Sequence, residues 1–192
     1  LGYKELMIVS GYSLAALGLA RQCGLEVPEK TVQAGLAYID SCTLPAGGVG
    51  YGPGTLLGTV PDPARTAAAI LALDSLGLHE DERRVALAQW LNKNTELLEN
   101  SHQGYLLQLA TTALAIRQLG VESYREFYLS LRPRLMLCHC GKERASFTTR
   151  PTAESLGQQL SNDIALGEVW ATAVYTLLIG LASDQAPTFR PH

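Results

Sequence analysis

The feature that most constrains how this chain can fold is a recurring Ala- and Leu-rich segment. Apolar residues recur at three and four positions along each copy, which is the spacing of one helix face, and the alternation typical of β-strands is nearly absent. The copies recur about every 50 residues, as in proteins built from repeated helical hairpins. They are LAALGLARQCGL, RTAAAILALDSLGL, ATTALAIRQLG and ATAVYTLLIGL, and the glycines that end them are Gly24, Gly77, Gly120 and Gly180.

Seven helices are expected, in a single domain that spans residues 1–192. Pro28 suits the first turn of the second helix, and Asp62 and Pro63 suit the N-cap and first position of the third. The polar stretch 141–165 predicts a long irregular loop, and residues 184–192 predict an extended or poorly ordered tail. The expected helices cover residues 6–22, 27–41, 62–77, 79–94, 105–119, 123–137 and 167–181.

The helices are expected to pair as hairpins. Three of the four Ala-rich segments are followed by a more charged helix, such as HEDERRVALAQWLNKN. The Ala-rich member has little polar surface and is expected to be buried on most sides, whereas the charged member faces solvent. Apolar helices inside a layer of amphipathic ones form an α/α toroid. Seven helices make about three and a half hairpins, so we expect an open, partial toroid.

Composition excludes some classes of partner. Hydrophobic residues make up 47% of the chain and charged residues 17%, which indicates a folded protein with a large core. The net charge of −3, without a basic cluster, argues against nucleic-acid binding. No apolar run reaches the roughly 18 residues of a membrane helix. The cysteines Cys23, Cys42, Cys138 and Cys140 are too few for a disulfide scaffold and favour a reducing compartment such as the cytoplasm, without fixing the localisation.

Three stretches resemble the prenyltransferase and squalene-cyclase repeat superfamily. They are LEVPEKTVQAGLAYIDSCTLPAGGVGYGPG, DPARTAAAILALDSLGLHEDERRVALAQWLNKN and GEVWATAVYTLL. In that family a glycine-rich turn closes each outer helix of an α/α toroid. The resemblance extends over most of residues 13–181. It is specific for the fold and much less so for activity.

The same resemblance argues against the chemistry of the family. Its protein prenyltransferases hold zinc with an Asp-x-Cys pair and a later histidine, and Arg65 stands where that histidine would be. Arginine stays protonated and cannot ligate zinc. The Asp-x-Cys pair is absent, and so is the Asp-x-Asp-Asp motif with which cyclases of the family protonate an alkene. No metal or cofactor is therefore expected.

The glycine-rich loop GGVGYGPG has three interpretations. A phosphate cradle would need a preceding strand and a following Gly-Lys-Ser/Thr, and neither is present. A structural turn is favoured, in which Gly47, Gly48 and Gly50 let the chain reverse close to the next helix and Tyr51 packs down as an aromatic plug. Contact with a ligand is the third interpretation.

The triplet Cys138-His139-Cys140 is the one metal-like cluster. It offers two thiolates and an imidazole, whereas a stable zinc site usually needs four ligands, with His102 as a distant fourth. Reactive thiols are a second interpretation. The favoured one is an ordinary helix end, because this position corresponds to an eroded second copy of the glycine turn with Phe147 in the aromatic place.

Polar residues at the starts of the Ala-rich helices form a candidate rim site. Repeat equivalence places these starts on one edge of the ring, where paired carboxylates could serve a glycoside hydrolase or a lyase. Helix capping is the competing explanation for the acidic members. The candidates are Asp62, Arg65, His102, Tyr105, Asp163, Glu168 and Trp170.

The leading functional hypothesis is a catalytically degenerate repeat domain that binds a protein partner or an apolar small molecule on its concave face. Because an open arc leaves apolar helices at its ends, a homo-oligomer or a partner protein is expected to cover them. The alternative is a diverged toroid enzyme, terpenoid or prenyl first and carbohydrate-active second. A third hypothesis is a spacer subunit in a larger assembly.

Overall fold

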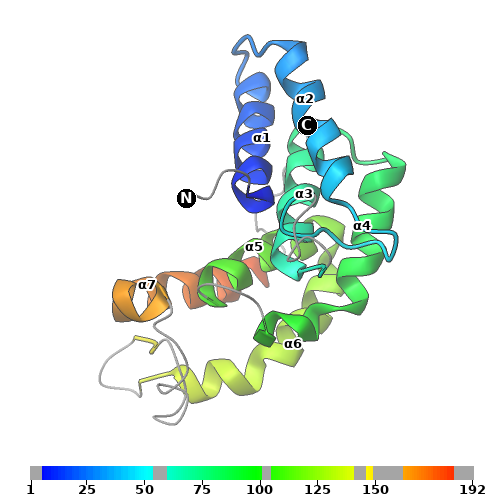
Figure 1. Cartoon of the computed structure of the whole chain (residues 1–192). Coiled ribbons are helices and arrows are strands. Elements are labelled where there is room, and N and C mark those ends of the chain that lie inside the picture. The colour runs from blue at the N-terminus through cyan, green and yellow to red at the C-terminus, as the bar shows by residue number, and fades with distance from the viewer. Residues whose placement is uncertain (1–5, 54–59, 101–104, 141–145, 149–161, 184–192) are drawn as a thin grey trace.

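The structure is a computed structural model that describes residues 6–53, 60–100, 105–140, 146–148 and 162–183 (Figure 1). Within these residues the chain is all-helical, as the sequence predicts, and its only β-pairing is two isolated bridges. The elements are α1 (Met7–Gln22), α2 (Glu29–Cys42), α3 (Pro63–Ser75), α4 (Glu82–Lys93), the 3-10 helix η2 (Thr95–Asn100), α5 (Tyr105–Leu119), α6 (Val121–Cys138) and α7 (Asn162–Leu181).

The largest difference from the expected boundaries is at α7. This helix begins at Asn162, inside the stretch 141–165 that was expected to be a loop. The backbone leaves helical geometry at Gly167, with φ 71° and ψ −165°, so the expected start at Gly167 marks a kink between two helical pieces. Residues 146–148 of that stretch are also described, whereas 141–145, 149–161 and the tail 184–192 lie outside the described residues.

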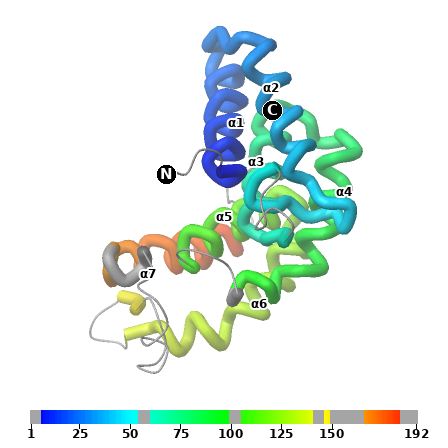
Figure 2. The backbone as a smooth tube through the Cα atoms, viewed as in Figure 1, coloured from blue at the N-terminus to red at the C-terminus, as the bar shows by residue number. Residues whose placement is uncertain are grey.

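The helices pack in two layers. In the inner layer α1 packs against α3, α3 against α5, and α5 against α7. In the outer layer α2 packs on α1, α4 on α3, and α6 on α5. The pair α1 and α2 lies at one end of the molecule, and α6 and α7 lie at the other (Figure 2). In the described part of the chain, no helix combines the length and apolar character needed to cross a membrane.

The middle inner helix α3 and its outer neighbour α4 differ in burial as their composition predicts, whereas the Ala-rich α1 buries only Met7, Gly11, Leu14 and Gly18. Every residue of α3 except Arg65 is buried, because alanine presents little surface and α1, α4 and α5 surround the helix. In α4 only Leu87, Ala88 and Leu91 are buried. The Ala-rich helix thus forms the centre of the core, and the charged helix covers it.

The turn between α2 and α3 recurs between α6 and α7. In the first turn Thr43 pairs with Val49, whose N–H donates to Thr66 Oγ1 at 3.0 Å. In the second, His139 pairs with Phe147, whose N–H donates to Thr172 Oγ1 at 3.0 Å. The flanking bonds also match: Leu44 N–H to Gly48 O (2.9 Å) with Cys140 N–H to Ser146 O (2.9 Å), and Gly50 N–H to Cys42 O (2.9 Å) with Thr148 N–H to Cys138 O (2.8 Å).

These bonds confirm the second copy of the turn and fix the correspondence between α3 and α7. Phe147 takes the place of Val49 and not of Tyr51, the aromatic residue of the first turn. Thr172 takes the place of Thr66, so each residue of α7 from Glu168 onward has a counterpart in α3 or its N-cap.

The sequence predicts that Gly180 ends the fourth Ala-rich repeat, but in the structure Ser183 has that place. Gly24 and Gly77 follow α1 and α3 with φ near 79° and 78°, a backbone that favours glycine. Their N–H groups bond to Arg21 O and Asp74 O, and the N–H of Ser183 bonds to Gly180 O in the same way. Ser183 therefore occupies the turn position, and Gly180 is the second-last residue of α7.

Candidate functional site

Asp62 and Arg65 of the proposed rim are both engaged in local structure. Asp62 is buried, and its Oδ1 accepts the N–H groups of Ala64 (2.9 Å) and Arg65 (3.1 Å), which makes it the N-cap of α3. The Arg65 guanidinium lies 5.2 Å from the centroid of the Tyr51 ring and donates to Val60 O at 3.2 Å. The capping interpretation therefore accounts for Asp62.

Tyr105 belongs to a second cluster. It is the first residue of α5, and the Arg134 guanidinium of α6 stacks over its ring at 3.8 Å from the centroid. Next to it, Tyr175 of α7 donates its hydroxyl to the buried Cys138 sulfur at 3.4 Å. Burial, together with Cys138, raises the pKa of the Tyr175 hydroxyl, which keeps it protonated as a donor. This cluster joins α5, α6 and α7.

Of the remaining rim residues, the structure describes only some of the side chains. His102 lies outside the described residues, and Asp163 is in the first turn of α7 with its side chain outside them. Glu168 is exposed and Trp170 is half-buried against the core. Glu168 takes the place of Asp62, but α3 and α7 are separated by α5.

The glycine-rich loop is shaped by a close approach to α4. A Cβ on Gly48 would lie 2.6 Å from both Pro61 Cβ and Trp90 Cε2, so no larger residue fits there. Gly47 has φ 103°, and Gly48 has no such left-handed backbone. Tyr51 is half-buried, and its carbonyl accepts the N–H of Met7 at 3.1 Å. These contacts support the structural interpretation of the loop.

The Cys138-His139-Cys140 triplet ends α6 as an ordinary turn. Cys138 is buried, and the His139 ring meets Phe147 edge-on with centroids 5.2 Å apart. Within the described residues, no three His, Cys, Asp or Glu side chains gather where they could hold a metal ion.

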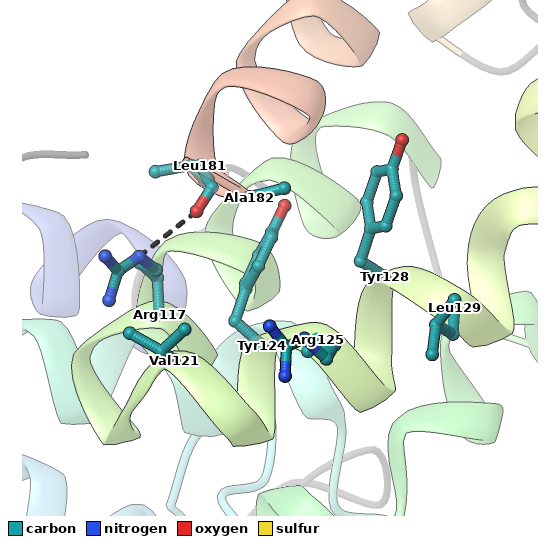
Figure 3. A pocket seen from close by; sticks show the side chains of 8 residues that line it. All are labelled: Arg117, Val121, Tyr124, Arg125, Tyr128, Leu129, Leu181 and Ala182. Carbon is teal, nitrogen blue, oxygen red and sulfur yellow. Dashed lines mark hydrogen bonds between the residues drawn. The ribbon is translucent and has the colours of Figure 1, made fainter. Parts of the chain in front are cut away.

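A pocket that the sequence did not reveal lies between α6 and the end of α7 (Figure 3). Its volume is about 170 Å³, which suits a small group. Tyr124 and Tyr128 stack along one wall with centroids 6.4 Å apart, and Tyr124 donates its hydroxyl to Leu178 O at 2.6 Å. Burial raises the pKa of the Tyr124 hydroxyl. The lining residues are Arg117, Val121, Tyr124, Arg125, Tyr128, Leu129, Leu181 and Ala182.

Side chains from one repeat bond to the last carbonyls of the next inner helix. Such carbonyls lack helical partners and carry partial negative charge, so amide and guanidinium donors stabilise them. In each inner helix the accepting carbonyl belongs to the residue two positions before the turn residue, which is Gly77, Gly120 or Ser183. The bonds are Gln22 Nε2 to Ser75 O (2.7 Å), Arg84 Nη2 to Gln118 O (3.5 Å) and Arg117 Nε to Leu181 O (3.1 Å).

The exposed side of α7 is apolar where the matching side of α3 is covered. Val169, Leu177 and Ile179 are 84%, 38% and 45% exposed. Their counterparts in α3 are Pro63, Leu71 and Leu73, all of them buried. Periodicity alone could not distinguish the covered side of α3 from the exposed side of α7, because both helices have the composition of a buried inner helix. The two matching turns align the residues of α3 and α7, and this alignment shows the difference.

Each of the two turns has a threonine whose hydroxyl accepts a backbone N–H, and Thr66 in the first turn gives a direct test of this geometry. Thr66→Val is expected to lower the free energy of unfolding by about 1–3 kcal/mol, because it leaves the buried Val49 N–H without its acceptor. Thr66→Ser keeps the hydroxyl and should lose less than half as much. Urea unfolding followed by circular dichroism measures both, and equal stability of the valine variant and the wild type would contradict the prediction.

Comparison of the chain with models of protein families, with curated proteins and with solved structures found no match.

Proposed function

We propose that this chain is a helical-hairpin repeat domain of the prenyltransferase and squalene-cyclase type, an open α/α-toroid arc, that lacks catalysis and binds a protein. The alternation of inner and outer helices supports the repeat architecture, as do the two matching turns and the bonds between successive repeats. A protein of this kind acts through the surface that its repeats leave open.

The loss of catalysis is supported by what the family's catalytic positions do here. Arg65 stands at the position of the zinc-binding histidine, and its guanidinium is held by the Tyr51 ring and by Val60 O. One carboxylate oxygen of Asp62 accepts hydrogen bonds from two backbone N–H groups. These groups stabilise the start of α3.

The observation that carries the binding proposal is the exposed apolar face of α7. The sequence predicted binding on the concave side, but α3, in the middle of the inner layer, is buried at every position except Arg65. On α3 the face that matches the exposed face of α7 is covered by helices of this chain. The occupant that fits is therefore an apolar helix of a protein.

The pocket between α6 and α7 favours a second candidate function. Four of its lining residues are apolar, and these together with the stacked tyrosines suit a small apolar molecule. A diverged terpenoid enzyme would use the same kind of pocket, and a bound isoprenoid in mass spectra of the purified protein would favour it.

Photo-cross-linking tests the protein-binding proposal. A photoreactive benzoylphenylalanine at position 177, in cells that express the protein, is expected to give a protein adduct that Val169→Lys removes. The matched control places the same group at Val85, which is 40% exposed on α4. Adducts that are the same at both positions, or that survive Val169→Lys, would overturn the proposal.

A further inference from the structure

The pocket between α6 and the end of α7 contains a buried positive charge. Arg117 of α5 lines this pocket and is only 5% exposed. Its Nε donates to Leu181 O at 3.1 Å and its Nη2 donates to Ser183 O at 3.4 Å. Both acceptors are uncharged carbonyls, and no carboxylate of the described residues forms an ion pair with this guanidinium. The wall of the pocket therefore holds a cation whose counter-charge is not among the described residues.

The bond from Arg117 to the end of α7 does not itself require a charge. In the first repeat the uncharged amide of Gln22 makes the corresponding bond to the end of α3, at 2.7 Å. In the second repeat Arg84 makes it to the end of α5, but Asp74 neutralises that guanidinium at 2.9 Å. Burying a guanidinium is unfavourable, and the carbonyls at a helix end offset only part of the cost. An anion in the pocket would offset more of it.

None of the side chains that line the pocket supplies this anion. The lining contains no aspartate or glutamate. Tyr124 donates its hydroxyl to Leu178 O at 2.6 Å, and burial raises the pKa of this hydroxyl, so it stays uncharged. The second arginine of the lining, Arg125, is exposed and pairs with Glu122 at 3.1 Å. The charge that the pocket presents is therefore the single positive charge of Arg117.

The rest of the lining is apolar or aromatic. Figure 3 shows Arg117 at one end of the row of lining side chains and Leu129 at the other, with Val121 and the tyrosine rings between them. The volume of about 170 Å³ suits a small molecule. A ligand that matches this lining has one anionic group at the Arg117 end and an apolar body along the rings.

We propose that this pocket binds a small monocarboxylic acid, with its carboxylate on Arg117 and its apolar body against Tyr124 and Tyr128. The planar N–H groups of a guanidinium match the oxygens of a carboxylate, and Nη1 of Arg117 donates to no described residue. A single buried charge favours one carboxylate over a phosphate, which carries nearly two charges. The inference is independent of protein binding at α7, and it narrows the second candidate function from an apolar molecule to an acid.

Fluorine NMR with para-fluorobenzoate as the probe tests the need for a charge. The acid is expected to bind the wild type with a Kd of about a millimolar or below, the range for a molecule of this size. The uncharged para-fluorobenzamide has the same ring and should bind at least roughly tenfold more weakly. Equal binding of the two probes would overturn the inference and leave an apolar ligand as the second candidate. Binding of neither probe would overturn both.

Variants of the lining test the place of the probe. Arg117→Gln removes the charge and keeps an amide donor like that of Gln22, so it should weaken benzoate binding by at least roughly tenfold. Arg125→Gln, the matched change at the exposed arginine, should change it by less than about twofold. Val121→Phe, at a lining residue that is 36% exposed, should block the probe while Arg117 stays in place. Benzoate binding that survives Arg117→Gln or Val121→Phe would overturn the inference.

Asp184→Asn distinguishes a bound acid from an acid of the chain itself. Asp184 is the residue after Ser183 and lies outside the described residues. The inference expects this variant to change benzoate binding by less than about twofold. If the Asp184 carboxylate were the counter-charge of Arg117, its removal would free the guanidinium and raise the affinity for benzoate by about tenfold or more. Such a gain would overturn the inference.

Discussion

Replacing Gly18 with alanine is expected to lower the free energy of unfolding by about 3 kcal/mol, although alanine ordinarily stabilises a helix. A Cβ at position 18 would lie 2.3 Å from the Ser75 Oγ and 2.7 Å from the Ser75 carbonyl carbon. The Ser75 hydroxyl could rotate away, but its carbonyl is backbone inside α3, where every residue except Arg65 is buried. The clash can be relieved only by moving α1 away from α3, which opens the core.

Gly35→Ala is the matched control for this prediction. Gly35 is also a mid-helix glycine, on α2, and the atoms nearest its added Cβ are the ends of the Leu14 side chain, 2.9 Å away. A leucine side chain can shift, so stability should change by less than about 1 kcal/mol. Urea unfolding of both variants gives the comparison. Equal stabilities would show that α1 does not approach α3 as closely as described.

Most helix boundaries could be predicted because their signals are local. Asp62 followed by Pro63 marks the start of α3, since the cap bonds reach only two and three residues along the chain. Gly24 and Gly77 mark helix ends because the turn after each needs a left-handed backbone. Burial of α3 agrees with its Ala-rich composition, and it also requires α1, α4 and α5 around the helix.

The features that sequence reasoning missed depend on contacts between repeats. Gly180 resembles a terminal glycine, but Ser183 holds the turn position, and only the hydrogen-bond pattern distinguishes the two. The pocket beside Tyr124 forms because Arg117 and Tyr124 bond to carbonyls at the end of α7, more than 50 residues away along the chain. Periodicity reports which face of a helix is apolar, and does not report which neighbour covers it.

Candidate sites were harder to predict than helices for a related reason. An acidic residue at a helix start suits both a cap and a catalytic rim. The distances from the Asp62 carboxylate to the N–H groups of Ala64 and Arg65 are what identify it as a cap. The exposed face of α7 was expected from the place of this helix at the end of the array, and not from its composition, which matches that of the buried α3.

Asp74→Ala is expected to cost about 3–5 kcal/mol, the range for breaking a buried ion pair from one side. The Asp74 side chain has no exposed surface. Its Oδ1 accepts the Arg84 Nε–H at 2.9 Å and lies 3.0 Å from His79 Nδ1. Arg84 is 15% exposed, so the substitution leaves a largely buried guanidinium without its carboxylate.

The double variant Asp74→Leu with Arg84→Met distinguishes the cost of leaving Arg84 unpaired from the net contribution of the ion pair to the free energy of unfolding. Replacing both charges with apolar groups is expected to restore most of the stability, because the penalty comes from the unpaired cation. Asp81→Ala breaks the partly exposed pair with Arg83 and serves as the control, with a loss below about 2 kcal/mol that includes its N-cap bond. Thermal and urea unfolding of the four proteins measure these differences. If Asp74→Ala were no more destabilising than Asp81→Ala, Asp74 would not be buried between α3 and α4.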